Sequence, residues 1–333
     1  MEKILNRKLV YYIAEAGVNH NGDINQAKKL IIEAKKSGAD AIKFQSFKTE
    51  EFLSNNKRNV ICNGKKINEF KMFKKLEFKN KWYEELDNVC KRNKIDFLTS
   101  VADINSAKLY LSLNKKILKI SSEDIINYPL LEFLGKLKYK IFILSTGMAN
   151  EEEIKIAIKL LKKNNILILM HCVSLYPTKI EDINLNRILS LRKKFKLEIG
   201  FSDHTIDDKA LLVARGLGCR VYEKHFTIDK QAMGPDHSLS LNPAETKEVI
   251  YYLKNYNTFL NEGNIAPGNR EKIISKKTRR CIVADKVIKK GEIITKDKIW
   301  LRRAANGLHP KYIYKVIGSK AKRNFKINEK III

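Results

Sequence analysis

Cysteine is scarce in this sequence, and no two cysteines form a Cys-x-x-Cys pair. The chain of 333 residues has five cysteines, an odd number. A secreted disulfide scaffold carries a denser and even set, and a zinc knuckle needs closely spaced pairs. The sequence therefore indicates neither class of protein, and we expect the chain to work in a reducing cytoplasm.

Long apolar runs are missing as well. The run at residues 9–14 is shorter than the hydrophobic region of a signal peptide, and no run approaches the roughly 20 residues that cross a bilayer. The Gly-x-Gly-x-x-Gly turn of dinucleotide-binding sheets is also absent. We therefore expect no membrane partner. Without the glycine-rich turn, the sequence gives little evidence for an open dinucleotide-binding sheet.

Acidic residues are few compared with basic ones. The chain has 65 Lys and Arg against 37 Asp and Glu, a formal net charge of +28. Such an excess raises nucleic acid or an anionic surface as a partner. Here the lysines stand in pairs along expected helices, as in Lys28-Lys29, and no motif interleaves them with aromatic residues. The pattern favours solvated helix faces and no nucleic-acid partner, on a surface that attracts anionic substrates.

The last fifth of the chain differs in composition from the rest. Residues 266–333 hold 20 Lys and Arg against 5 Asp and Glu. The full length also exceeds the size at which one hydrophobic core usually stops growing. We predict a large domain at residues 1–265, a linker at 266–277 and a small β-rich domain at 278–333.

Short apolar, β-branched runs alternate with longer segments of helical periodicity, which is typical of parallel βα units. There are eight such runs, at residues 11–14, 41–45, 96–100, 117–120, 141–144, 166–170, 197–201 and 221–222. Eight units over roughly 250 residues are the size of a closed parallel barrel. We predict an α/β fold, a (β/α)8 TIM barrel followed by the small domain, with an open doubly wound sheet as the alternative.

Polar and charged side chains stand at the ends of these runs, where the loops of a barrel converge and its reacting groups lie. They include Glu15, Lys43, Gln45, Thr99, Lys119, Ser122, Ser145, Ser174, Ser202, His204 and His225. A buried ammonium is costly unless it is paired or bound to an anion, although a single lysine can extend its amine to solvent. Two lysines beside the hydroxyls of Thr99, Ser122 and Ser145 favour a pocket for phosphate or carboxylate.

Two histidines, His204 and His225, close consecutive strand-like runs, and Asp236 follows in a glycine-bearing loop. Imidazole with oxygen ligands and open water positions suits a catalytic divalent ion, and the sequence does not separate Mn²⁺, Mg²⁺, Co²⁺ and Zn²⁺. Purely structural histidines are the alternative interpretation.

Seven motifs occur in order along nearly the whole chain. They lie at residues 14–22 (AEAGVNHNG), 43–45 (KFQ), 145–148 (STGM), 171–177 (HC and YP), 200–205 (GFSDHT), 223–226 (EKHF) and 234–237 (GPDH). Together they resemble the sialic acid synthase family. The tail, with Arg302-Arg303 ahead of Gly307, resembles that family's C-terminal antifreeze-like (SAF) module. The Gly-Pro-Asp-His run favours the sialic or legionaminic branch over the pseudaminic one.

The resemblance implies a transferase for carbohydrate biosynthesis that condenses phosphoenolpyruvate with the open aldehyde of an N-acetylated mannosamine-type sugar. The product would be a nine-carbon 2-keto sugar acid, N-acetylneuraminate or legionaminate, with release of phosphate. The sequence leaves open whether the sugar is N-acetylmannosamine or its 2,4-diacetamido-2,4,6-trideoxy relative. The cofactor implied is a divalent metal, Mn²⁺ before Mg²⁺ or Co²⁺, acting on the aldehyde as a Lewis acid.

Each family role falls on a matching position of this chain. The resemblance implies catalytic roles for Glu15, His204 and His225, metal binding by His204 and His225, phosphoenolpyruvate binding by Lys43, Thr99, Lys119, Ser122, Ser145, Ser174 and Ser202, and sugar binding by Gln45, Tyr176, Asp236 and Arg303. In the family the antifreeze-like module covers the barrel mouth of its dimer partner. Arg303 would therefore act on the partner subunit's site in a domain-swapped homodimer.

A few positions depart from the family's common pattern. Ser174 stands where asparagine is frequent, Glu123-Asp124 replace a Gly-Glu pair, and Ala304-Ala305 replace Pro-Gly. These departures affect the expected identity of the sugar and the expected pose of Arg303 more than the expected reaction.

Two other functions remain as alternatives: a Schiff-base or metal-dependent aldolase of the barrel class, and a non-enzymatic role in which the basic tail is a binding module.

Overall fold

The strands of the large unit close into a parallel barrel. The computed structural model describes residues 2–6, 8–54, 58–62, 64–260, 263 and 265–332. Eight strands follow one another around the barrel in the order β1-β10-β9-β8-β7-β6-β5-β2, and every neighbouring pair is parallel. Their bounds are Tyr11–Gly17 (β1), Ala41–Ser46 (β2), Asp96–Val101 (β5), Ile117–Ile120 (β6), Ile141–Ser145 (β7), Ile166–His171 (β8), Glu198–Asp203 (β9) and Val221–His225 (β10). The closed barrel is confirmed, and the open sheet is wrong.

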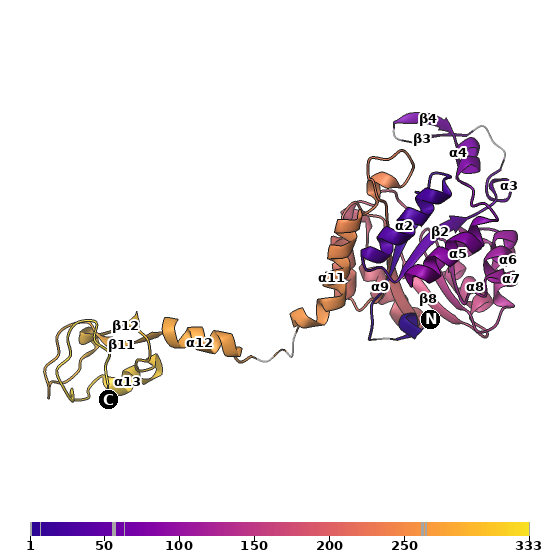
Figure 1. Ribbon diagram of the computed structural model, residues 1–333. Helices are drawn as coiled ribbons and strands as arrows, with labels where there is room; N and C mark the ends of the chain where they lie inside the picture. Colours follow the sequence, from indigo (N-terminus) through magenta and orange to yellow (C-terminus); the bar gives the residue numbers. More distant parts are fainter. Residues whose placement is uncertain are drawn as a thin grey trace. The chain divides into compact units, whose positions relative to one another are not determined.

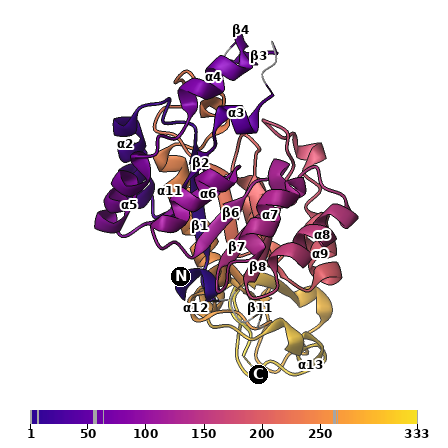
Figure 2. The same cartoon turned by 90° about the vertical axis from the view of Figure 1, so that its right-hand side faces the viewer.

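Helices surround the barrel (Figures 1 and 2), and some of them begin at a side chain that caps the first turn. They are α2 (Ile24–Lys36), α5 (Trp82–Asn93), α6 (Ile104–Ser112), α7 (Tyr128–Gly135), α8 (Glu151–Leu161), α9 (Asn186–Phe195), α10 (Lys209–Gly216) and α11 (Pro243–Leu260). The expected cap at Asp23 accepts a hydrogen bond from the backbone N–H of Asn25. Asn150 and Glu153 form a reciprocal capping box at α8, which satisfies backbone groups that the helix itself leaves free.

The barrel strands bury both faces, because successive side chains point to opposite sides. Side chains inside the barrel include Tyr11, Ile13, Leu98, Ile141, Ile143, Ile168, Met170 and Val221. Their neighbours in sequence, such as Tyr12, Phe142 and Tyr222, pack outward against the helices. This alternation fixes which residues at the strand ends face the barrel axis.

The segment after β2 adds structure at one end of the barrel. It carries α3 (Thr49–Phe52), a hairpin of β3 (Asn59–Cys62) and β4 (Lys65–Asn68), and α4 (Glu69–Leu76). Figure 1 shows the hairpin and α4 at the end opposite the N-terminus. The aromatic rings of Phe47, Phe52 and Phe73 pack within 5.5 Å of one another and hold α3 and α4 together.

The C-terminal part, Leu260–Ile333, is a separate compact unit. It contains α12 (Asn269–Thr278), the antiparallel strands β11 (Arg280–Ala284) and β12 (Ile299–Arg303), and α13 (Ile313–Val316). Its own small core includes Ile282, Ile294, Phe325 and Ile331. The expected linker at 266–277 is therefore largely helical, since α12 fills most of it.

Two expectations drawn from the composition, on membrane spans and on disulfides, can be compared with the structure. Within the described part of the chain, no helix combines the length and apolarity needed to cross a bilayer. Cys90, Cys172, Cys219 and Cys281 are all free thiols. The side chain of the fifth cysteine, Cys62, lies outside what the structure describes.

Candidate active site

Four buried charged side chains meet where β1, β2, β6 and β10 end. The Lys43 ammonium lies 2.6 Å from Glu15 Oε2 and 3.9 Å from Glu223 Oε2. The Lys119 ammonium lies 3.6 Å from Glu223 Oε1 and donates a 2.7 Å hydrogen bond to Ser145 Oγ. None of the four charged residues is more than 5% exposed. Two ammoniums and two carboxylates thus balance one another inside the barrel mouth.

The surroundings separate the pKa values of the two carboxyl groups. Burial raises the pKa of Glu15 to about 7, although the Lys43 ammonium opposes this shift. Burial acts in the same direction on Glu223, but Lys119 and Lys43 outweigh it and hold its pKa below the usual value. Burial also lowers the pKa of Lys119. Two neighbouring carboxyls with separated pKa values are an arrangement that acid and base chemistry uses.

Hydroxyl groups converge beside the lysines at Gly147. A methyl group added to Gly147 would meet Ser174 Oγ at 2.4 Å and Ser122 Oγ at 2.8 Å, so only glycine leaves room there. Ser122 Oγ accepts a hydrogen bond from the Gly147 backbone N–H, at 3.2 Å. Ser174 Oγ is buried without a hydrogen-bond partner in the described structure. These hydroxyls, with Ser145, form a donor-rich wall next to Lys119.

Thr99 is not part of this wall. Its Oγ1 is 2.6 Å from Ser46 Oγ and donates to the carbonyl of Phe44, on the outer face of the sheet. The next residue, Ser100, takes the inward position, because it lies two residues after Leu98 of the barrel interior. Ser100 also stands in register with Lys119 on the neighbouring strand. The prediction for Thr99 was therefore wrong by one residue, and one residue reverses the face in a strand.

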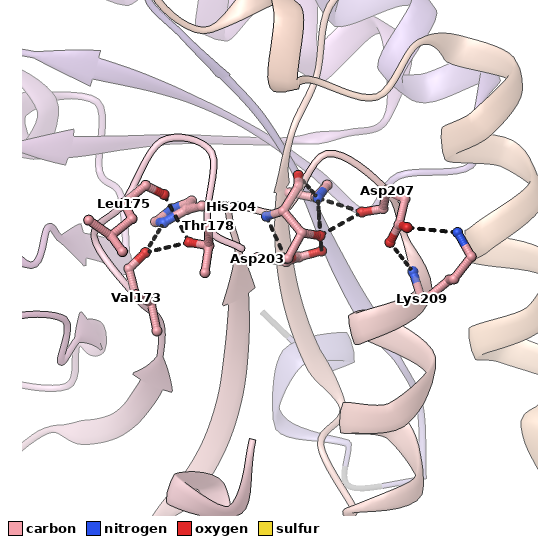
Figure 3. Close-up of polar contacts among 9 residues, drawn as sticks. Val173, Leu175, Thr178, Asp203, His204, Asp207 and Lys209 are labelled. Carbon is pink, nitrogen blue, oxygen red and sulfur yellow. Dashed lines mark hydrogen bonds and ion pairs between the residues drawn. The ribbon is translucent and has the colours of Figure 1, made fainter. Parts of the chain in front are cut away.

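His204 and His225 lie side by side, with ring centroids 5.6 Å apart. Nδ1 of His204 lies 2.7 Å from the carbonyl oxygen of Val173, a contact visible in Figure 3. A carbonyl only accepts, so Nδ1 carries the proton and Nε2 keeps its lone pair. Burial lowers the pKa of both histidines, and for His225 the nearby His204 and Lys43 add to the effect. Both rings are therefore neutral at physiological pH.

The predicted sugar-binding side chains in the barrel unit surround the two histidines. The Tyr176 ring lies over His204 at a centroid distance of 4.3 Å, and more than half of its side chain is exposed. Asp236 Oδ2 is 3.8 Å from Nδ1 of His225, and burial raises the Asp236 pKa to about 6, against the effect of Lys43. Gln45 Nε2 donates a long 3.4 Å hydrogen bond to Glu15 Oε1. These three side chains join the histidines to the charged cluster.

The two histidines fit a divalent metal ion. Nδ1 of His225 is buried and has no hydrogen-bond partner in the described structure, and Nε2 of His204 has a free lone pair. The described residues bring no group of three or more His, Cys, Asp or Glu together as a metal cluster. Two imidazoles with the remaining positions left to water and substrate suit a catalytic ion better than a structural one.

Arg303 lies in the separate C-terminal unit, at the end of β12 and in register with Arg280. Its action at a barrel mouth therefore stays a prediction. Ser202, by contrast, lies inside the barrel unit and donates a 3.0 Å hydrogen bond to Glu223 Oε1. Ser202 thus holds a carboxylate of the charged cluster.

Glu223 is the site residue that sequence reasoning did not assign. The apolar run of this strand covers only residues 221–222, and β10 ends at His225, the residue expected to close it. Glu223 is two residues before His225, so it shares the inward face, and it stands in register with Ser202. The two-residue period was the signal that could have identified it.

The fold and the site define an enzyme class: a TIM-barrel enzyme whose barrel mouth holds two lysines paired with two glutamates, several hydroxyl groups and two neutral histidines. Residues 30–265 match the NeuB family, and residues 279–331 match the SAF domain. The chain belongs to the NeuB family. It is a transferase-type enzyme of the sialic acid synthase kind, with a C-terminal SAF domain.

Relatives with assigned names support this membership. The chain is 40% identical to an N,N'-diacetyllegionaminic acid synthase of Campylobacter jejuni, over 97% of this chain and 99% of the relative. It is 32% identical to a pseudaminic acid synthase of the same species, over 97% and 95% of the two chains. A crystal structure of N-acetylneuraminic acid synthetase from Leptospira borgpetersenii in complex with citrate matches with a TM-score of 0.71 and 34% identity, covering 80% of this chain and 90% of that one.

Proposed function

We propose that this enzyme condenses phosphoenolpyruvate with 2,4-diacetamido-2,4,6-trideoxymannose to give N,N'-diacetyllegionaminate and phosphate. The observation that carries the reaction is the buried cluster of Lys43 and Lys119 with hydroxyls at the barrel mouth. The choice of sugar is supported by the higher identity to the legionaminic relative than to the pseudaminic one, and by the Gly-Pro-Asp-His run at residues 234–237.

Phosphoenolpyruvate would bind against the two lysines. Its phosphate and carboxylate are anionic, and Lys43 and Lys119 are the buried cations within reach of the strand ends. In the free site their charges are matched by Glu15 and Glu223, so a bound anion adds unbalanced negative charge. Glu15, whose pKa is about 7, is the group suited to take up a proton in response. Ser122, Ser145 and Ser174 would donate hydrogen bonds to the bound anion.

The sugar aldehyde would lie between the histidines and the bound phosphoenolpyruvate. C3 of phosphoenolpyruvate attacks the aldehyde carbon, and the aldehyde oxygen gains a proton. Water then adds at C2, the C2–O bond to phosphate breaks, and C2 becomes the keto group. Of the two protons of the water, one replaces the proton given to the aldehyde oxygen and the other leaves with phosphate. Protonated Glu15 lies beside Gln45 and Lys43 and is our candidate for the proton that reaches the aldehyde oxygen. Tyr176 and Asp236, which adjoin the histidines, would contact the sugar.

A divalent ion bound by His204 and His225, Mn²⁺ in the first instance, would polarise the aldehyde as a Lewis acid. The protein's own contribution is to keep both rings neutral and fixed. Val173 sets the tautomer of His204, and burial keeps both imidazoles unprotonated.

A phosphate-release assay with both candidate sugars tests this proposal. With Mn²⁺ present, we expect turnover to be faster with 2,4-diacetamido-2,4,6-trideoxymannose than with N-acetylmannosamine. Removal of metal with EDTA should stop turnover, and Mn²⁺ should restore it. A higher kcat/KM with N-acetylmannosamine would assign the enzyme to N-acetylneuraminate, and full turnover after complete metal removal would reject the metal site.

We further propose that Arg303 acts on the site of a dimer partner. The support is the match of residues 279–331 to the SAF domain and the family resemblance. Inactive Lys43→Ala and Arg303→Ala proteins should regenerate some active sites when mixed, if each site takes one residue from each subunit. No recovery under conditions that exchange subunits would reject action from the partner.

An aldolase that forms a Schiff base is the second candidate, because burial lowers the pKa of Lys119 and so favours a nucleophilic amine. Against it, the Lys119 amine already donates to Ser145 and faces Glu223. Borohydride treatment with a keto substrate would trap an adduct on Lys119 if this candidate were correct. We expect an unchanged protein mass.

A further inference from the structure

Behind the two histidines, a lysine and an aspartate pair on the outer face of the same strands. Asp203 of β9 and Lys224 of β10 stand in register, and each lies between two inward-facing residues. Their side chains are buried, and the Lys224 ammonium is 2.8 Å from Asp203 Oδ2. The strands therefore carry Ser202, His204 and His225 toward the axis while an ion pair lies on the opposite side.

The Lys224 ammonium binds one loop at several points. Besides Asp203, it donates to the carbonyl oxygens of Thr205 at 2.5 Å and of Asp207 at 2.7 Å, and it lies 3.3 Å from Thr205 Oγ1. Asp203 also accepts a 2.9 Å hydrogen bond from the Thr205 backbone N–H. His204 lies within this loop, between Asp203 and Thr205, so its backbone is held on both sides.

A second set of contacts holds His204 from the loop after β8. Its ring donates to the carbonyl of Val173, and its own carbonyl accepts from the backbone N–H of Thr178 at 2.8 Å. The Thr178 hydroxyl donates to the carbonyls of Val173 and Leu175. Figure 3 shows His204 between this group and the group formed by Asp203 and Asp207. His204 is thus held on one side by Val173 and Thr178 and on the other by the loop that Lys224 binds.

We infer that Lys224 is a positioning residue for the reaction: with Asp203 it fixes the loop that presents Nε2 of His204 toward His225 and the sugar aldehyde. This inference rests on the proposed function in taking His204 as a metal ligand. Partners that orient a ligand from behind typically change metal affinity or activity by 10–100-fold. The Lys224 ammonium makes four contacts, one with Asp203 and three with Thr205 and Asp207 of the loop that follows it. These exceed what pairing of one carboxylate needs, which is the reason to assign it this role.

A purely structural ion pair makes a different prediction, and a double variant separates the two. Lys224→Met alone leaves a buried, unpaired carboxylate and is expected to destabilise the fold. The double variant Asp203→Asn/Lys224→Met removes both charges, and the amide still accepts from the Thr205 N–H. Replacing a whole buried pair in this way is often neutral for stability. We expect the double variant to unfold at a higher temperature than Lys224→Met, because it leaves no unpaired charge, and still to position His204 poorly.

The decisive readouts need no turnover. Mn²⁺ titration, followed by the loss of its free EPR signal, should give an affinity about 10–100-fold weaker in the double variant. The second measurement uses metal-free protein labelled with ¹⁵N-histidine, in which a His204→Gln variant identifies the His204 signal. In the double variant this signal should no longer show the single Nδ1–H tautomer. The affinity for phosphoenolpyruvate should change far less than the affinity for Mn²⁺, because Lys43 and Lys119 lie on other strands and contact this part of β10 through Glu223, next to Lys224. Lys209→Met, which removes an exposed lysine paired with Asp207 of the same loop, should match wild type in each measurement.

Two results would overturn the inference in distinguishable ways. If the wild-type protein binds Mn²⁺ and the double variant binds it equally well with an unchanged His204 tautomer, Lys224 only stabilises the fold. If the wild-type protein binds no Mn²⁺, the proposed metal site fails and the role of Lys224 fails with it.

Discussion

The two ends of the barrel interior differ sharply in chemistry although the same strands build both. At the N-terminal ends, Tyr11, Ala41, Ile117 and Val221 form a closed apolar core that includes Ile4 of α1 (Glu2–Leu5). At the C-terminal ends, a few residues further along the same strands, two lysines face two glutamates. One end buries apolar surface, which stabilises the fold, and the other buries charges, which costs free energy.

This difference indicates how the molecule separates stability from reactivity. Burial in the apolar end contributes to folding, and the buried hydroxyl of Tyr11 is satisfied by a 2.7 Å hydrogen bond to Asp96 Oδ2. The polar end keeps groups that lack partners in the described structure, among them Ser174 Oγ and Nδ1 of His225. Such groups are expensive unless a ligand completes them. Changes at one end should therefore affect stability, and changes at the other should affect turnover.

Loss of a cation from the polar end should have the largest effect. Lys43→Met removes a buried ammonium that faces both glutamates, and we expect kcat/KM for phosphoenolpyruvate to fall by about 10³-fold. Steady-state phosphate release measures it. Lys36→Met, which removes an exposed lysine paired with Glu33 on α2, should leave kcat/KM unchanged. A fall of less than tenfold in Lys43→Met would contradict the anion pocket.

A cavity in the apolar end should lower stability and leave turnover nearly unchanged. Ile168→Ala removes a side chain that is 1% exposed inside the barrel, and the free energy of unfolding should fall by about 2–5 kcal/mol. Urea denaturation measures this loss, while kcat/KM of the folded enzyme should stay close to wild type. Ile166→Ala, at the half-exposed start of the same strand, should cost far less. If Ile168→Ala lowered kcat/KM as strongly as Lys43→Met, the two ends would not be separable.

A methyl group in the polar end should impair binding with little loss of stability. Gly147→Ala places a carbon 2.4 Å from Ser174 Oγ and 2.8 Å from Ser122 Oγ, so these hydroxyls must move. We expect kcat/KM for phosphoenolpyruvate to fall by roughly 10²-fold, as for other displacements near 1 Å. Gly268→Ala, where an added carbon meets nothing within 4 Å, is the matched control. Equal activity of both variants would remove Ser122 and Ser174 from the pocket.

The smallest expected effect is a pH dependence of the free energy of unfolding that comes from His20, a histidine in the barrel wall. His20 is buried among Phe44, Phe78 and Trp82, and burial lowers its pKa to about 4. An unfolded histidine titrates near pH 6.5, so between pH 6.5 and 4 the unfolded chain binds more protons and stability falls as pH falls. From this residue alone we expect a loss of about 1.4 kcal/mol at pH 5.5.

Urea denaturation at pH 7.5 and pH 5.5 checks this expectation. His20→Gln should show a smaller loss between the two pH values than wild type, whereas His309→Gln, at an exposed histidine of the C-terminal unit, should not. His171, His204, His225 and His237, whose pKa values burial also lowers, contribute in the same direction and remain in both variants. An identical pH dependence in His20→Gln and wild type would show that His20 is not neutral in the fold.

Much of the site could be read from the sequence because strand ends in a parallel barrel converge by geometry. Glu15, Lys43, Lys119, Ser145, His204 and His225 all occupy the predicted end of the barrel. Thr99 and Ser100 could not be told apart, since the sequence does not state where the alternation of β5 starts. Glu223 was left out because the apparent run ends before it, while pairing with β9 extends the strand.

The sequence by itself determined the barrel and the family, because eight βα units and seven ordered motifs are properties of residue order. Only the tertiary structure decided which charges neutralise one another and which face each strand residue takes. Lys224 illustrates the reason. Its neighbours in the chain face the site, whereas its partners, Asp203, Thr205 and Asp207, come from another strand and loop. Contacts between segments distant in sequence arise from strand register, which the residue order alone does not specify.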